Sequence, residues 1–170
     1  MYFQLERSLE PRAVAELRLV RSRTVPRHPD LDALLNDLLP FAERMLAEHG
    51  EFYPFGGSIT PDGRHISVGA KGSSDRPPSQ ELIDMMTNEF RSQVSEGKIR
   101  AAGICFEVRV VPPGQVDKTD AIQLALECEG GDAVDVFVPY AQLPHGEFTY
   151  GELFACERIP SLCVQQHQQT

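Results

Sequence analysis

The chain of 170 residues contains no tryptophan and only four cysteines, and none of its apolar runs is long enough to cross a bilayer. A membrane-spanning helix needs about 20 predominantly apolar residues, so we expect no membrane segment. The first ten residues also lack the basic-then-apolar layout of a signal peptide. We therefore expect a cytoplasmic protein whose thiols stay reduced.

Motifs for metal and nucleotide binding are missing as well. No C-x-x-C, H-x-x-x-H or G-x-x-x-x-G-K-[ST] pattern occurs, although many zinc sites and P-loops are built on such spacings. We therefore expect no cofactor and no metal. The cysteines lie at positions 105, 128, 156 and 163, and we interpret them as thiols packed in the core. A nucleophile pair of Cys105 or Cys128 with a histidine is the alternative.

Charge is distributed unevenly along the chain. Residues 1–29 hold six arginines and three glutamates, a net charge of +3, whereas the remainder holds ten Lys or Arg and 22 Asp or Glu, a net charge of −12. We predict a basic N-terminal arm over 1–29, one domain over 30–164 and a disordered tail over 165–170. Because an acidic domain repels nucleic-acid backbones, we expect it to bind no nucleic acid and to favour a basic protein as partner.

Hydrophobic periodicity predicts two helices. Apolar residues recur at helical spacing from Asp30, a favourable N-cap, to Gly50, a favourable C-terminal stop. Pro40 lies inside this pattern and predicts a kink or break near Leu39, because it removes a backbone donor. A second helix is predicted over 79–96, with its first residue as the N-cap.

Alternating apolar residues predict the strands. A Pro-Asp-Gly turn indicates a hairpin over 51–59 and 64–71. Further strands are expected over 99–111, 121–129 and 133–140, with a short one over 150–157. The order α-β-β-α-β-β-β is typical of an α+β fold with a single sheet, mostly antiparallel or mixed, whose helices pack on one face.

Residues that could bind a ligand or partner gather in two regions. The loop over 117–120 groups two carboxylates, an amine and a hydroxyl, and aromatic residues precede the first turn and return near the C-terminus. Because alternate strand residues face opposite ways, we expect some of these rings to form an exposed partner site. The alternative is that the rings fill one end of the core. The candidate binding residues are Tyr53, Phe55, Asp117, Lys118, Asp120, Tyr140, Tyr150 and Glu152.

Three short strings carry a resemblance that covers about residues 30–163. They are Phe-Tyr-Pro-Phe-Gly at 52–56, Lys-Thr-Asp-Ala-Ile at 118–122 and Tyr-Gly-Glu-Leu-Phe at 150–154. On these strings the chain resembles a group of small bacterial α+β proteins that have no assigned activity. The resemblance therefore implies a fold class and no particular function.

Three hypotheses of function follow. One is that the arm binds nucleic acid, provided that it is ordered or folds on contact, through Arg18, Arg21, Arg23 and Arg27. The other two concern the acidic domain. In the first, the acidic domain is a non-enzymatic binding module that neutralises or escorts a basic macromolecule, as an immunity or accessory protein does. In the second, an enzyme or small-ligand site lies between the loop over 117–120 and the aromatic C-terminal region. There Asp120 or Glu152 would serve as base and Lys118 would stabilise charge.

Overall fold

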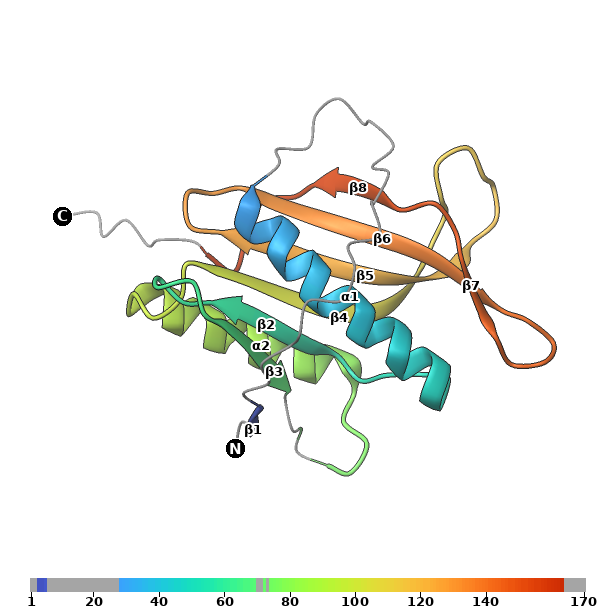
Figure 1. The fold of residues 1–170 in the computed structure, drawn as a ribbon, viewed down its shortest axis with the longest axis horizontal. Coiled ribbons are helices and arrows are strands. Elements are labelled where there is room, and N and C mark those ends of the chain that lie inside the picture. Colours follow the sequence, from blue (N-terminus) through green and yellow to red (C-terminus); the bar gives the residue numbers. More distant parts are fainter. Residues whose placement is uncertain (1–2, 6–27, 70–71, 73, 164–170) are drawn as a thin grey trace.

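The computed structural model describes residues 3–5, 28–69, 72 and 74–163 (Figure 1). Its helices are α1 (Pro29–His49) and α2 (Ser79–Ser95), and neither is long and apolar enough to span a membrane. Its strands are β1 (Phe3–Leu5), β2 (Phe55–Ile59), β3 (His65–Gly69), β4 (Ala101–Val110), β5 (Thr119–Cys128), β6 (Ala133–Gln142), β7 (Phe148–Tyr150) and β8 (Phe154–Glu157). The predicted α+β class with a single sheet is confirmed. Predictions for the rest of the arm and for the tail lie outside the described residues.

Every strand pair that the structure describes is antiparallel, in the order β1-β3-β2-β4-β5-β6-β7, and β8 also pairs with β6. The strand predicted over 150–157 is split, because β7 and β8 pair with different stretches of β6. Pro139 of β6 lies opposite the gap between β7 and β8, and as a proline it has no N–H to donate to a neighbouring strand. Its carbonyl accepts a hydrogen bond of 2.7 Å from the Gly151 N–H.

Helix α1 packs its leucine-rich face on the sheet. Its N-cap is His28 and not the predicted Asp30, because the extended His28 accepts a hydrogen bond of 3.2 Å from the Asp30 N–H through Nδ1. Pro29 follows at the first helical turn, where a backbone N–H has no helical acceptor. Gly50 ends the helix in the left-handed conformation, as predicted. The buried residues of α1 are Leu31, Leu34, Leu35, Leu38, Leu39, Ala42 and Leu46.

The break predicted at Pro40 does not form, since α1 runs continuously from Pro29 to His49. Pro40 is exposed, and so is Asn36, whose carbonyl loses its helical donor. On the solvent side of a helix, water can hydrogen-bond such a carbonyl. The proline is therefore tolerated without interrupting the helix.

The two helices lie on opposite faces of the sheet (Figure 1), so the prediction that both cover one face is wrong. Ala101 and Cys105 of β4 belong to the cluster under α1, whereas Ala102 and Ile104 belong to the cluster under α2. Successive residues of a strand point to opposite faces. The uninterrupted apolar run of β4 therefore marks a strand that is buried on both sides.

Three strand glycines allow both helices to approach the sheet. A Cβ atom on Gly57 would lie 3.1 Å from Leu38 of α1, and one on Gly103 would lie 3.0 Å from the same side chain. On the other face, a Cβ atom on Gly56 would lie 3.1 Å from the ring of Phe90 and 2.7 Å from the Gly103 carbonyl oxygen. These glycines are therefore required for packing.

Three of the four cysteines are buried, as predicted, but Cys156 is exposed. It lies on β8, the short strand that pairs with β6. Burial raises the pKa of Cys128 to about 11, that of Cys163 to about 12 and that of Cys105 well above its ordinary value. Since the thiolate is the nucleophile, these shifts weigh against the Cys-His alternative.

A buried carboxylate holds the C-terminal segment against the sheet. Glu127 of β5 is fully buried and accepts hydrogen bonds of 2.6–3.0 Å from the backbone N–H groups of residues 161–163. Arg158 lies 3.3 Å from the same carboxylate. Leu162 and Cys163 thereby complete the apolar cluster under α2.

Candidate functional site

Three of the predicted binding residues form a row across three strands. Asp120 of β5 pairs with Tyr140 of β6, which pairs with Tyr150 of β7. Residues paired in this way place their side chains on the same face of a sheet. This row lies on the face of the sheet that α1 covers. Ile122 is two residues from Asp120 and Val138 is two residues from Tyr140, and both belong to the apolar cluster under α1.

Glu107 joins this row from β4. Its Oε1 accepts a hydrogen bond of 2.7 Å from the Tyr140 hydroxyl, and its Oε2 accepts one of 3.3 Å from the Phe52 N–H. Burial and the adjacent Glu107 carboxylate raise the pKa of Tyr140 above its ordinary range, so its hydroxyl stays a donor at neutral pH. On the same face, Arg109 forms an exposed ion pair of 3.4 Å with Asp120.

Aromatic rings connect the row to α1. Phe55 contacts Phe41 of α1 and also Phe52, with ring centroids 4.7 and 5.6 Å apart, and Tyr140 contacts Phe148 at 5.8 Å. All of these rings except Phe41 are half-buried and pack against the core under α1. They therefore close one end of the core while their outer edges reach the surface.

Glu43, near the C-terminal end of α1, adds a further carboxylate. Burial raises the pKa of this half-buried group. Burial and the Glu43 charge both raise the pKa of Tyr150, so the two side chains lie within electrostatic range of each other. Tyr150 is 38% exposed. Together these carboxylates and rings form one end of the molecule, which we call the acidic aromatic end. Its residues are Phe41, Glu43, Phe52, Phe55, Glu107, Asp120, Tyr140, Phe148 and Tyr150.

The other predicted residues lie around this end without forming a catalytic set. Asp117 and Lys118 are exposed in the loop before β5, and Glu152 is exposed between β7 and β8. Tyr53 is 52% exposed, next to Phe52. None of Asp120, Glu152 and Lys118, the groups suggested as base and charge stabiliser, lines the pocket described below.

Sequence reasoning missed Phe41, Glu43 and Glu107 as members of this end. Glu107 could have been noticed in the sequence. It is a carboxylate two residues from the buried Cys105 on the same strand, so its side chain points to the same, buried face of the sheet. Phe41 and Glu43 flank the buried Ala42 on α1, and no local pattern distinguishes them from ordinary surface positions.

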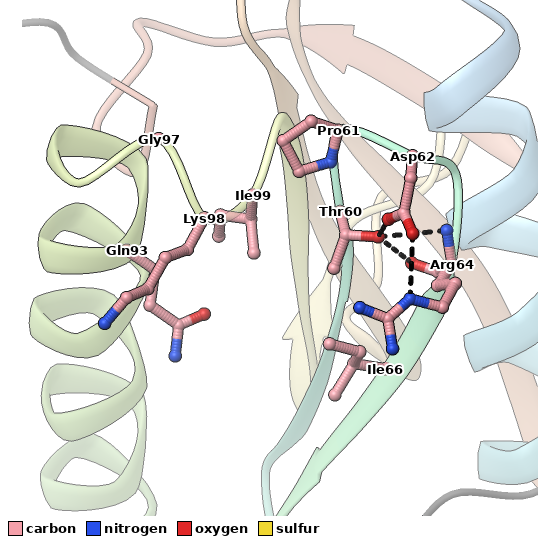
Figure 2. Close-up of a pocket in the computed structure, with 9 residues that line it drawn as sticks. All are labelled: Thr60, Pro61, Asp62, Arg64, Ile66, Gln93, Gly97, Lys98 and Ile99. Atoms are coloured by element: carbon pink, nitrogen blue, oxygen red, sulfur yellow. Dashed lines mark hydrogen bonds and ion pairs between the residues drawn. The ribbon is translucent and has the colours of Figure 1, made fainter.

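A pocket of about 480 Å³ lies between the β2–β3 turn and the C-terminal end of α2 (Figure 2). Asp62 accepts hydrogen bonds from Thr60 and from Arg64, the latter at 3.1 Å, and Lys98 pairs with Glu96. The charged groups of the pocket are thus already paired with near neighbours. Its lining residues are Thr60, Pro61, Asp62, Arg64, Ile66, Gln93, Gly97, Lys98 and Ile99.

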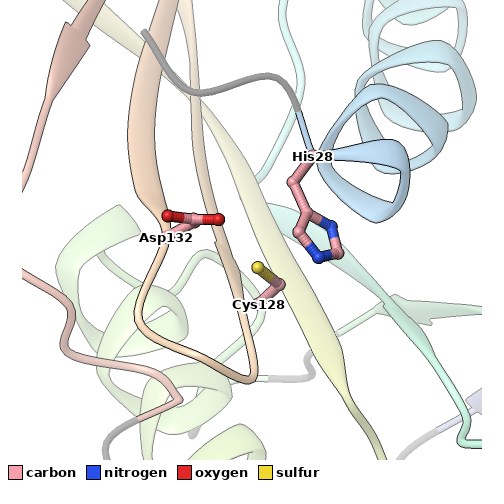
Figure 3. Close-up of side chains that lie close together, drawn as sticks. All are labelled: His28, Cys128 and Asp132. Atoms are coloured by element: carbon pink, nitrogen blue, oxygen red, sulfur yellow. The ribbon is translucent and has the colours of Figure 1, made fainter.

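A third grouping lies at the opposite end of α1 from the acidic aromatic end. His28, Cys128 and Asp132 each direct one donor atom into a common space (Figure 3), and these atoms lie within 4.8 Å of one another. Cys128 is buried, and the other two side chains are half-buried. Nitrogen, sulfur and carboxylate oxygen are the ligand types that zinc binds in proteins.

Comparison of the chain with protein-family models, with curated proteins and with solved structures gives no significant match. The resemblance to small bacterial α+β proteins therefore stays a prediction, and the function has to be inferred from the side chains themselves.

Proposed function

We propose that this protein binds a basic protein partner through the acidic aromatic end, as an accessory or immunity-type protein would. The observation that carries the proposal is that carboxylates from three different elements lie near two neighbouring tyrosines. Glu107 accepts a hydrogen bond from Tyr140, Asp120 pairs with Tyr140 across the sheet, and the charge of Glu43 acts on the exposed Tyr150. Carboxylates next to partly exposed rings suit a segment that contributes lysine or arginine, because cations pair with carboxylates and also stack on aromatic faces.

Long-range electrostatics favour the same class of partner. Residues 30–170 carry a net charge of −12, whose field would attract a cationic protein and accelerate the encounter. Rates governed by such a field fall as salt is added, because the Debye length shortens from about 30 Å at 0.01 M to about 8 Å at 0.15 M.

The rings supply the short-range part of the interaction. Tyrosine is common among residues that dominate binding energy, since it buries a large apolar area with few rotatable bonds. Glu107 is held in place before binding by Tyr140 and by the Phe52 N–H. Pre-organised groups lose less entropy on association, which favours affinity.

The test compares two exposed carboxylates on opposite sides of the molecule. Wild type, Asp120→Lys and Asp84→Lys are used as bait for affinity purification from the native organism, and any protein bound stoichiometrically is purified. Asp84 is a suitable control because it is an exposed carboxylate of α2, on the other face of the sheet. Calorimetry with the purified pair then gives the dissociation constant at two salt concentrations.

We expect a partner of high isoelectric point that binds wild type and Asp84→Lys about equally and Asp120→Lys at least ten-fold more weakly, about 1.4 kcal/mol. Wild-type binding should also weaken with salt. Equal binding by the two variants, insensitivity to salt or an acidic partner would each overturn the proposal.

A further inference from the structure

We infer that His28, Cys128 and Asp132 form a binding site for a divalent transition metal, with Zn²⁺ as the best fit. The site is separate from the acidic aromatic end and does not depend on the proposed function. It brings together residues that lie about 100 positions apart in the sequence, so their convergence is a property of the fold.

The spacing of the three donor atoms is close to that of a metal site. Zinc binds imidazole nitrogen and carboxylate oxygen at about 2.0–2.2 Å and thiolate sulfur at about 2.3 Å, which puts tetrahedral ligands about 3.4–3.8 Å apart. The donor atoms of this cluster lie within 4.8 Å of one another. A contraction of about 1 Å, within the reach of small side-chain rotations, would complete the geometry.

Two of the ligands are positioned by one tight turn. Cys128 ends β5 and Asp132 precedes β6, and the Cys128 N–H donates a hydrogen bond of 3.0 Å to the Asp132 carbonyl. Gly130 and Gly131 adopt φ values of 113° and 95°, which permit this turn at little steric cost. The thiol and the carboxylate are therefore held on the same side of a short hairpin (Figure 3).

The third ligand is positioned by the start of α1. Nδ1 of His28 accepts from the Asp30 N–H, and the imidazole turns its other nitrogen toward the Cys128 thiol (Figure 3). Asp30 is fixed by two hydrogen bonds of 2.8 and 2.9 Å from Arg100. An imidazole that binds metal through Nε2 carries its proton on Nδ1, so metal binding would replace the hydrogen bond from the Asp30 N–H with one that Nδ1 donates. The Asp30 Oδ2, now 4.0 Å from Nδ1, would accept it after a small movement of the ring, the arrangement common around zinc-bound histidines.

The donor set also selects the class of ion. A thiolate excludes Mg²⁺ and Ca²⁺, which require oxygen ligands, whereas one sulfur, one nitrogen and one oxygen suit Zn²⁺ and Co²⁺. Metal binding would displace the proton of the Cys128 thiol to solvent, and the resulting thiolate and the Asp132 carboxylate together would neutralise a divalent cation. Three protein ligands leave one tetrahedral position for water or a small anionic ligand, as in zinc sites that are not purely structural.

The test uses the full chain, stripped with a chelator and titrated with Co²⁺. We expect one equivalent to give the thiolate-to-cobalt charge-transfer absorption and the visible bands of a tetrahedral site, with Zn²⁺ abolishing both. Cys128→Ser should lose the charge-transfer band, and Cys156→Ser, which changes an exposed cysteine outside the cluster, should keep it. Asp132→Asn should weaken Zn²⁺ binding by about ten-fold or more.

A second readout covers the case in which Cys128→Ser fails to fold. Zn²⁺ should raise the thermal midpoint of wild type and of Cys156→Ser, but not that of His28→Gln, whose altered side chain is only half-buried. The inference is wrong if wild type shows only the weak spectrum of adventitious octahedral Co²⁺. It is also wrong if Cys128→Ser retains the charge-transfer band, or if His28→Gln is stabilised by Zn²⁺ as much as wild type.

Discussion

The hydroxyl of Tyr140 on β6 donates a hydrogen bond of 2.7 Å to Glu107 on β4, across the intervening strand β5. The second oxygen of the same carboxylate accepts from the Phe52 N–H, which lies in the segment between α1 and β2. Glu107 thus links three parts of the chain at the acidic aromatic end. A carboxylate in this position would otherwise lose its hydration without compensation.

Replacing Tyr140 by phenylalanine should therefore destabilise the fold. The change keeps the ring and removes the donor, so the half-buried Glu107 oxygen loses its partner, and we expect the free energy of unfolding to fall by about 1–2 kcal/mol. Urea denaturation measures this. Tyr150→Phe is the matched control and should stay within about 0.5 kcal/mol of wild type. An equal loss in both variants would mean that the Tyr140–Glu107 hydrogen bond contributes nothing specific.

The pH dependence of stability should reveal Glu43. Burial raises its pKa above the ordinary value of 4.5, so the protonated form stabilises the fold below that pH, and the contribution is lost as pH rises through the folded pKa. Glu43→Gln stays neutral throughout. We expect it to match wild type below pH 4.5 and to exceed it at pH 7 by no more than about 0.5 kcal/mol, because the group is partly exposed.

Thermal denaturation of both proteins between pH 4 and 8 tests this prediction about Glu43. A Glu43→Gln variant that is less stable than wild type at pH 7 would contradict the sign of the effect.

Loss of the buried carboxylate of Glu127 should release the C-terminal segment. Glutamine cannot accept all of the hydrogen bonds from residues 161–163 and leaves Arg158 without its buried charge partner. We expect Glu127→Gln to lower the free energy of unfolding by about 3 kcal/mol. Hydrogen exchange should show the amides of residues 161–163 exchanging much faster, while Glu157→Gln, at an exposed position, should leave them protected.

Gly56, the strand glycine under Phe90 of α2, should tolerate a side chain far less well than Gly69. A Cβ atom on Gly56 would lie 2.7 Å from a backbone oxygen and 3.1 Å from the ring of Phe90, whereas one on Gly69 meets nothing within 4 Å. We expect Gly56→Ala to cost about 1–3 kcal/mol through overpacking and Gly69→Ala to remain within about 0.5 kcal/mol of wild type. Equal thermal midpoints would show that the sheet and α2 move apart freely.

The candidate site was predictable in part. Asp120 and Tyr140 both appeared among the candidate residues, and the short Gly-Gly-Asp turn between their strands is enough to pair them across the hairpin. Tyr150 was also a candidate, but its place beside Tyr140 depends on the loop between β6 and β7. Glu107 was missed because its contact with Tyr140 requires the register of two successive strand pairs.

The sequence by itself determined the helices, most of the strands and the α+β class, because helical periodicity, strand alternation and turn residues are local signals. Only the tertiary structure decided that α2 packs opposite α1, since β4 is apolar on both faces and either face could accept a helix. It also decided that His28, which the sequence assigned to the N-terminal arm, lies near Cys128. Contacts between segments so far apart depend on long-range packing, which leaves no pattern in either segment alone.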